Sequence, residues 1–259
     1  MKETLRTSDF GTGLTELHVY ESRNKTSRVI LLLKGIYSYH FELDDFKTDL
    51  TGLKWDQAFV RYFLEHAHVI CVNTSRLADH DQTIFSQRED SFYGKNYSQE
   101  VSDVKIAFEK ALQILGAKGV QEPIIHLIGK SFGGTVFLGM PEVTSKACSI
   151  AMLGSGCGRS KETAKPLLST LPDEEKLLET IRDYSGFFSL YRGEFDEVVP
   201  IESQEKIVKA SGAKVTNYVT IRDTDHEFEK INGQDSLEPG ILLRKMLLDT
   251  ILLSEKHRT

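Results

Sequence analysis

The sequence has 259 residues, of which 40% are hydrophobic and 27% charged, and its formal net charge is −6. That apolar content can fill a sizeable core, so a disordered or fibrous chain is excluded, and the acidic balance argues against general binding to nucleic acid or anionic membranes. No apolar run approaches the ~20 residues that a membrane helix needs, and no signal peptide is recognised. We expect a single domain over residues 1–259 in the cytoplasm, with Cys71, Cys148 and Cys157 as free thiols.

Short apolar runs alternate with helical patterns along the chain. Residues 1–25, with an alternating stretch at 14–20, predict an antiparallel hairpin. Strands are predicted at 28–33, 68–74, 123–128, 148–153, 187–191 and 214–221, and several of these runs lack polar alternation, as expected for strands covered by helices on both faces. Helices are predicted at 55–64, at 101–115, from first helical positions at Pro172 and Pro200, and at 237–253. This alternation predicts an α/β fold with a doubly wound, mostly parallel sheet and an antiparallel N-terminal hairpin.

The most informative motif is Gly129-Lys130-Ser131-Phe132-Gly133, which follows a predicted strand and precedes a predicted helix. A glycine-flanked turn at this point projects a serine from the end of the strand, beside helix N–H groups that stabilise negative charge. A glycine-rich turn without catalytic purpose is the plainer alternative. A nucleotide-binding P-loop is excluded, because it requires glycine at position 124, which is Ile in mid-strand.

Two further candidates follow later strands. Asp196 lies in the turn after the 187–191 strand, and His226 lies in the loop after the 214–221 strand. In a parallel sheet the carboxyl ends of the strands meet at one edge, so we expect Ser131, Asp196 and His226 to lie at that edge. A serine nucleophile needs a base, and the base needs an acid that orients it.

From about residue 28 to residue 228 the sequence resembles the α/β-hydrolase superfamily, in which the chain order is also Ser, Asp, His. The resemblance implies Ser131 as nucleophile, His226 as general base and Asp196 as orienting acid. It also implies an oxyanion hole formed by the backbone N–H groups of Ile36 and Phe132, with no metal or cofactor.

Two positions depart from the pattern of this superfamily. Lys34 stands where many members have histidine, and Asp225 precedes His226 where glycine is common. The first departure leaves the hydrogen bonding of the oxyanion loop open. The second belongs to an acidic loop, in which Asp223, Asp225 or Glu227 could compete with Asp196 as the partner of His226.

The surroundings of the site are less sharply defined by sequence. Residues 154–185 are predicted to form a short cap-like insertion rather than a large lid. Residues 75–99 are long and polar but carry Phe85, Phe92 and Tyr93, so this stretch either lines the substrate pocket or lies on the surface as a solvated loop. The eight histidines offer no convincing set of metal ligands.

The hypothesis that follows is a serine hydrolase that cleaves a small-molecule carboxylic ester or thioester through an acyl-enzyme intermediate. An acyltransferase, a C–C hydrolase or a peptidase with the same triad stays open, because the pocket and not the triad selects the substrate. A non-catalytic member that binds a small molecule also stays open, on the strength of Lys34 and the unusual histidine loop.

Overall fold

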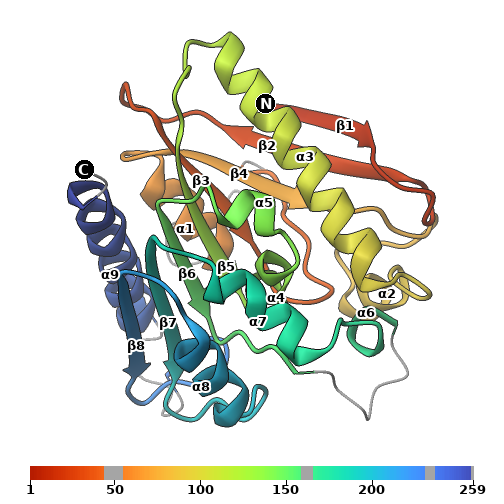
Figure 1. Ribbon diagram of the computed structural model, residues 1–259. Helices are drawn as coiled ribbons and strands as arrows, with labels where there is room; N and C mark the ends of the chain where they lie inside the picture. Colours follow the sequence, from red (N-terminus) through yellow and green to blue (C-terminus); the bar gives the residue numbers. More distant parts are fainter. Residues whose placement is uncertain (44–54, 159–165, 231–236, 258–259) are drawn as a thin grey trace.

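The computed structural model describes residues 1–43, 55–158, 166–230 and 237–257. Its centre is an eight-stranded sheet in the order β1-β2-β4-β3-β5-β6-β7-β8 (Figure 1). The strands are β1 (Lys2–Arg6), β2 (Leu14–Tyr20), β3 (Arg28–Leu33), β4 (His68–Asn73), β5 (Ile124–Lys130), β6 (Ser149–Leu153), β7 (Phe187–Gly193) and β8 (Val215–Ile221).

The pairing of the strands confirms the predicted fold class. From β4 to β8 all neighbours are parallel, whereas β2 pairs antiparallel with both β1 and β4. The N-terminal hairpin therefore extends one edge of a parallel sheet. The six parallel strands occupy the predicted regions, with ends that differ by at most two residues.

Helices cover both faces of the sheet (Figure 1). They are α1 (Trp55–Phe63), α2 (Phe85–Asp90), α3 (Tyr97–Ala117), α4 (Phe132–Leu138), α5 (Pro141–Thr144), α6 (Pro166–Ser169), α7 (Glu174–Arg182), α8 (Ile201–Ala210) and α9 (Leu237–Lys256). Because successive strand residues point to opposite faces, Ile30 packs with the buried residues of α1 and α9, while Leu31 packs with those of α3, α4, α7 and α8. Each face thus has its own apolar core, as a doubly wound sheet requires.

The first residues of the helices were predicted less accurately than the ends of the strands. Pro200 is the residue before α8, and Pro172 precedes Asp173, which is in turn the residue before α7. Both prolines were expected at the first helical position, so this prediction is wrong by one residue in α8 and two in α7. The α3 helix begins at Tyr97, earlier than predicted, because Asn96 and Gln99 form a reciprocal capping box with the first backbone N–H groups. Among the described helices, none has the length and apolar character to cross a membrane.

Candidate active site

Ser131 lies in a strained turn between β5 and α4. Its backbone has φ of 51° and ψ of −121°, a left-handed conformation that is rare outside glycine. Leu153, at the end of β6, accepts a hydrogen bond of 2.7 Å from the Ser131 N–H. Position 133 accepts only glycine, because a Cβ there would lie 2.6 Å from the Lys34 carbonyl oxygen. The turn is thereby fixed to both neighbouring strands.

Asp196 and His226 contact each other directly. Nδ1 of His226 lies 3.0 Å from Oδ1 of Asp196, and both side chains are buried. If Nδ1 carries the proton and donates it to the carboxylate, Nε2 is left as an acceptor. Asp225, the competing carboxylate, does something different: its Oδ1 accepts from the backbone N–H groups of Glu227 and Glu229 and shapes the histidine loop.

Several donors surround the Asp196 carboxylate. Oδ1 also accepts from the backbone N–H groups of Val198 (3.0 Å) and Val199 (3.1 Å), and Gln204 lies 3.4 Å from Oδ2. Burial alone would raise the pKa of Asp196, but the hydrogen bond and charge of His226 and these backbone donors outweigh it and hold the pKa below its usual range. The group is therefore an anion at neutral pH.

Gly154 connects the serine turn with the Asp196–His226 pair. Ser131 follows β5 and Asp196 follows β7, so β6 lies between them in the sheet. Gly154 is the first residue after β6, has φ of 58°, and lies so close that a Cβ would be 3.2 Å from both the Asp196 and His226 side chains. The absence of a side chain at this position leaves room for the Asp196–His226 pair at the end of β6, the strand whose Leu153 carbonyl oxygen binds the Ser131 N–H.

The candidate oxyanion hole consists of Phe132 and a loop of residues 34–40 after β3. Phe132 is the first residue of α4, where backbone N–H groups have no partner within the helix. Ile36 lies in the loop next to Gly35, where a Cβ would be 3.4 Å from the Ser131 Cβ. Lys34, the departure from the expected histidine, donates from Nζ to the Tyr39 carbonyl oxygen and so closes the loop on itself.

A cavity of about 420 Å³ opens beside Ser131. Its walls are mostly apolar and come from the 34–40 loop, α4, residues 156–158, residues 168–171 and residues 198–203. They include Ile36, Phe132, Leu168, Leu171, Val199 and Pro200. The segment predicted as a short cap thus supplies part of the wall, although residues 159–165 of it lie outside the described residues. A cavity of about 490 Å³ between α3, α4 and α7 is lined by none of the predicted site residues.

Residues 75–99 match neither of the two expected roles completely. Phe85 and Tyr93 are exposed, as a surface loop would have them, and the stretch contains the short helix α2. Phe92, by contrast, is buried and lines a small cavity of about 30 Å³ beneath the 34–40 loop, together with Arg76. This stretch supports the loop from below and is not part of the cavity beside Ser131.

Two features of the site were missed by sequence reasoning. Gly154 was assigned no role of its own within the predicted cap-like insertion, although a glycine directly after a central strand is a signal for close approach. Lys130 is buried and forms an ion pair with Glu227, which joins the serine turn to the histidine loop. That pair spans 97 residues of sequence and carries no local signal. In the part of the chain that the structure describes, no three His, Cys, Asp or Glu side chains gather as a metal site requires.

Comparison with known proteins gives matches at the level of structure. No family model matches the sequence, and the comparison with curated proteins finds no match. A soluble variant of monoglyceride lipase from Saccharomyces cerevisiae is similar with a TM-score of 0.65 and 13% identity, over 95% of this chain and 92% of the other.

Two other solved structures extend the comparison. Est1E from Butyrivibrio proteoclasticus is similar with a TM-score of 0.61 and 12% identity, over 98% of this chain and 99% of the other. A structure described with the metagenome-derived lipolytic enzymes LipS and LipT has a TM-score of 0.64 and 11% identity, over 91% and 96%. The chain has the α/β-hydrolase fold. At such identities the similarity establishes the fold, and the activity has to be argued from the site.

Proposed function

We propose that this chain is a serine hydrolase that cleaves a carboxylic ester or thioester. The observation that carries the proposal is the buried Asp196–His226 pair, 3.0 Å between Oδ1 and Nδ1, on the same sheet edge as a serine with φ of 51°. A structural serine turn would need neither a buried carboxylate–imidazole pair nor a glycine that lets them approach. In this proposal residues 1–259 form one catalytic domain, and residues 154–185 form its short cap-like insertion.

The proposed reaction begins when Oγ of Ser131 attacks the carbonyl carbon while Nε2 of His226 accepts the hydroxyl proton. The backbone N–H groups of Ile36 and Phe132 stabilise the oxyanion that forms. When the tetrahedral intermediate collapses, the bond to the alcohol or thiol breaks, and His226 returns the proton to this leaving group. The product of this half-reaction is an acyl ester of Ser131.

Deacylation repeats the same steps with water. His226 accepts a proton from water as the water oxygen attacks the acyl carbon. The second tetrahedral intermediate then collapses, which releases the carboxylic acid, and His226 returns the proton to Oγ of Ser131. Asp196 keeps the imidazole in one orientation and stabilises its protonated form throughout. An acceptor alcohol or amine in place of water would make the protein an acyltransferase, which the same residues allow.

The two departures from the superfamily pattern no longer favour a non-catalytic binder. Lys34 provides one of the hydrogen bonds within its loop, and Asp225 accepts backbone hydrogen bonds within the histidine loop. The mostly apolar wall of the 420 Å³ cavity fits a small ester.

Turnover of short p-nitrophenyl and thioester substrates, measured for the wild type and for Ser131→Ala, tests the proposal. We expect turnover by the wild type and a loss of at least about 10³-fold in kcat for the variant, at unchanged thermal stability. Equal turnover by the folded Ser131→Ala variant would refute the assignment.

A further inference from the structure

The 34–40 loop holds an unfavourable backbone conformation. Tyr37 has φ of 58°, although it is not glycine. Such conformations persist only where the surroundings determine them strongly. Within the loop, the Ser38 N–H donates to the Gly35 carbonyl oxygen at 3.2 Å, and Lys34 donates to Tyr39. These bonds close the loop but do not attach it to the sheet.

The attachment comes from the residues at the end of β4. Asn73 binds both backbone groups of His40: its Oδ1 accepts the N–H at 2.6 Å, and its Nδ2 donates to the carbonyl oxygen at 2.8 Å. Arg76 donates from Nη2 to the Ser38 carbonyl oxygen at 2.8 Å and from Nη1 to that of Thr74 at 2.6 Å. Arg76 thus joins the middle of the loop, two residues from Ile36, to the strand that neighbours β3.

Two aromatic rings contact the guanidinium of Arg76. It lies 4.5 Å from the centre of the Phe92 ring and 5.1 Å from that of Tyr39. Only 8% of the residue is exposed, and burial lowers the pKa of Arg76 to about 10. Contact with two rings and donation from two nitrogens to two separate carbonyl oxygens suit a planar group with several N–H donors, which lysine lacks.

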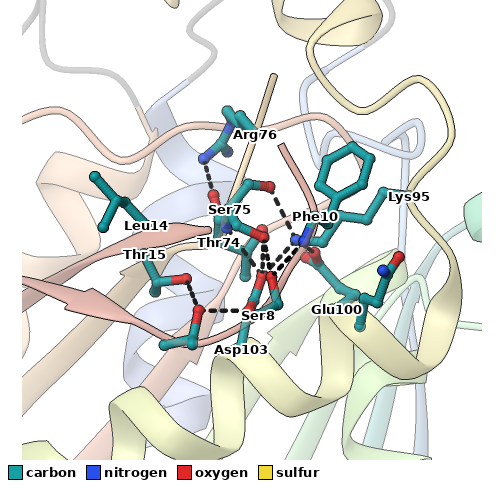
Figure 2. A network of polar contacts seen from close by, with 12 residues as sticks. Ser8, Phe10, Leu14, Thr15, Thr74, Ser75, Arg76, Lys95, Glu100 and Asp103 are labelled. Atoms are coloured by element: carbon teal, nitrogen blue, oxygen red, sulfur yellow. Dashed lines mark hydrogen bonds and ion pairs between the residues drawn. The ribbon is translucent and has the colours of Figure 1, made fainter. Parts of the chain in front are cut away.

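The backbone before Arg76 is itself held by a buried network, shown in Figure 2. Asp103 of α3 accepts from the backbone N–H of Ser75 at 2.9 Å and from its Oγ at 2.5 Å. Lys95 donates to the same carboxylate at 2.7 Å and to the Ser75 carbonyl oxygen at 3.0 Å. Lys95 and Asp103 are both fully buried. This network gives Arg76 a rigid base on α3.

We propose that Arg76 is a positioning residue for the oxyanion loop: by holding the Ser38 carbonyl oxygen it sets the place of the Ile36 N–H, without touching the substrate. This role rests on the proposed function, but the attachment of the loop does not. Loss of Arg76 is expected to lower kcat and leave KM almost unchanged, because an oxyanion donor acts mainly in the transition state.

The test compares Arg76→Met and Arg76→Lys with the matched variant Arg244→Met. Arg244 also lies against two rings, 5.8 Å from those of Phe59 and Tyr62, but it is on α9 over the opposite face of the sheet. With p-nitrophenyl butyrate we expect kcat to fall about 10- to 100-fold in Arg76→Met and less in Arg76→Lys, with KM within about threefold. Arg244→Met is expected to lose stability but keep kcat within about twofold.

A second readout does not depend on catalysis. Hydrogen exchange followed by mass spectrometry should show faster exchange of residues 34–40 in both Arg76 variants and no change there in Arg244→Met. If Arg76→Met does not fold, Arg76→Lys carries the test. Unchanged kcat together with unchanged exchange would overturn the proposal. If the wild type shows no ester turnover, the proposed function fails, while the exchange of residues 34–40 still decides whether Arg76 holds the loop.

Discussion

The substitution Gly154→Ala tests whether the Asp196–His226 pair works as a catalytic unit. The new Cβ would lie 3.2 Å from Oδ2 of Asp196 and from Cε1 and Nδ1 of His226, so the pair has to move by a few tenths of an ångström. The residue also has φ of 58°, where alanine costs about 1–2 kcal/mol relative to glycine. For a domain of this size that cost lowers Tm by about 2–4 °C.

Gly119→Ala separates the two effects. Gly119 also has a positive φ, 97°, but a Cβ there would meet no atom within 4 Å. Both variants therefore bear a backbone penalty, and only Gly154→Ala displaces the Asp196–His226 pair. We expect kcat/KM for a p-nitrophenyl ester to fall about tenfold or more in Gly154→Ala, equivalent to about 1.4 kcal/mol of transition-state stabilisation, and to stay within about twofold in Gly119→Ala.

The assay is steady-state kinetics at 25 °C, with Tm measured on the same samples. If Gly154→Ala keeps wild-type kcat/KM, then the geometry of the Asp196–His226 pair does not limit the reaction, and the reasoning is wrong. An equal loss of activity in both glycine variants would also refute it, because the effect would then come from stability alone.

Two further predictions use single substitutions. Asp196→Asn keeps the shape of the side chain but removes the charge that orients His226, and kcat should fall about 10³- to 10⁴-fold with little change in KM; a loss below tenfold would exclude Asp196 as the orienting acid. Glu255→Gln tests stability against pH: burial would raise the pKa of Glu255, but hydrogen bonds from His126 and Arg28 and their charges lower it to about 2. A carboxylate whose pKa is lowered in the folded state stabilises the fold at pH values above the unfolded pKa of 4.5, and this stabilisation is lost as the pH falls towards 2. Near pH 7 we expect the wild type to be more stable than Glu255→Gln by about 1–2 kcal/mol. The corresponding difference in Tm should vanish between pH 4.5 and pH 2. A difference that is constant with pH would contradict this.

Strands β3 to β7 could be predicted because their apolar residues form nearly continuous runs, as is typical of strands covered on both faces. The edge strand β8 is interrupted by polar residues and is mostly not buried, and it was predicted from its β-branched residues. His126, in the middle of β5, is fully buried, and its Nδ1 lies 2.8 Å from the Ser149 Oγ. The helix α2 gave no comparable signal. None of its residues is buried, so it has no apolar face that could create a helical period within the 75–99 stretch.

Part of the site could not be predicted from the sequence, because it depends on the order of the strands in the sheet. Positions after three strands suggested that Ser131, Asp196 and His226 share one edge, because all carboxyl ends of a parallel sheet do. The supports of the oxyanion loop depend instead on which strand lies next to β3. That strand is β4, and its last residue, Asn73, and the following Arg76 reach the loop. Nothing in the local sequence around Arg76 reveals this neighbour.

The central claim, an activated serine at position 131, is tested most directly by labelling with a fluorophosphonate and measuring the intact mass. We expect a single adduct on the wild type, located at Ser131 by peptide mapping, and no adduct on Ser131→Ala. A folded wild-type protein that takes up no label, or an adduct that persists in Ser131→Ala, would contradict the claim.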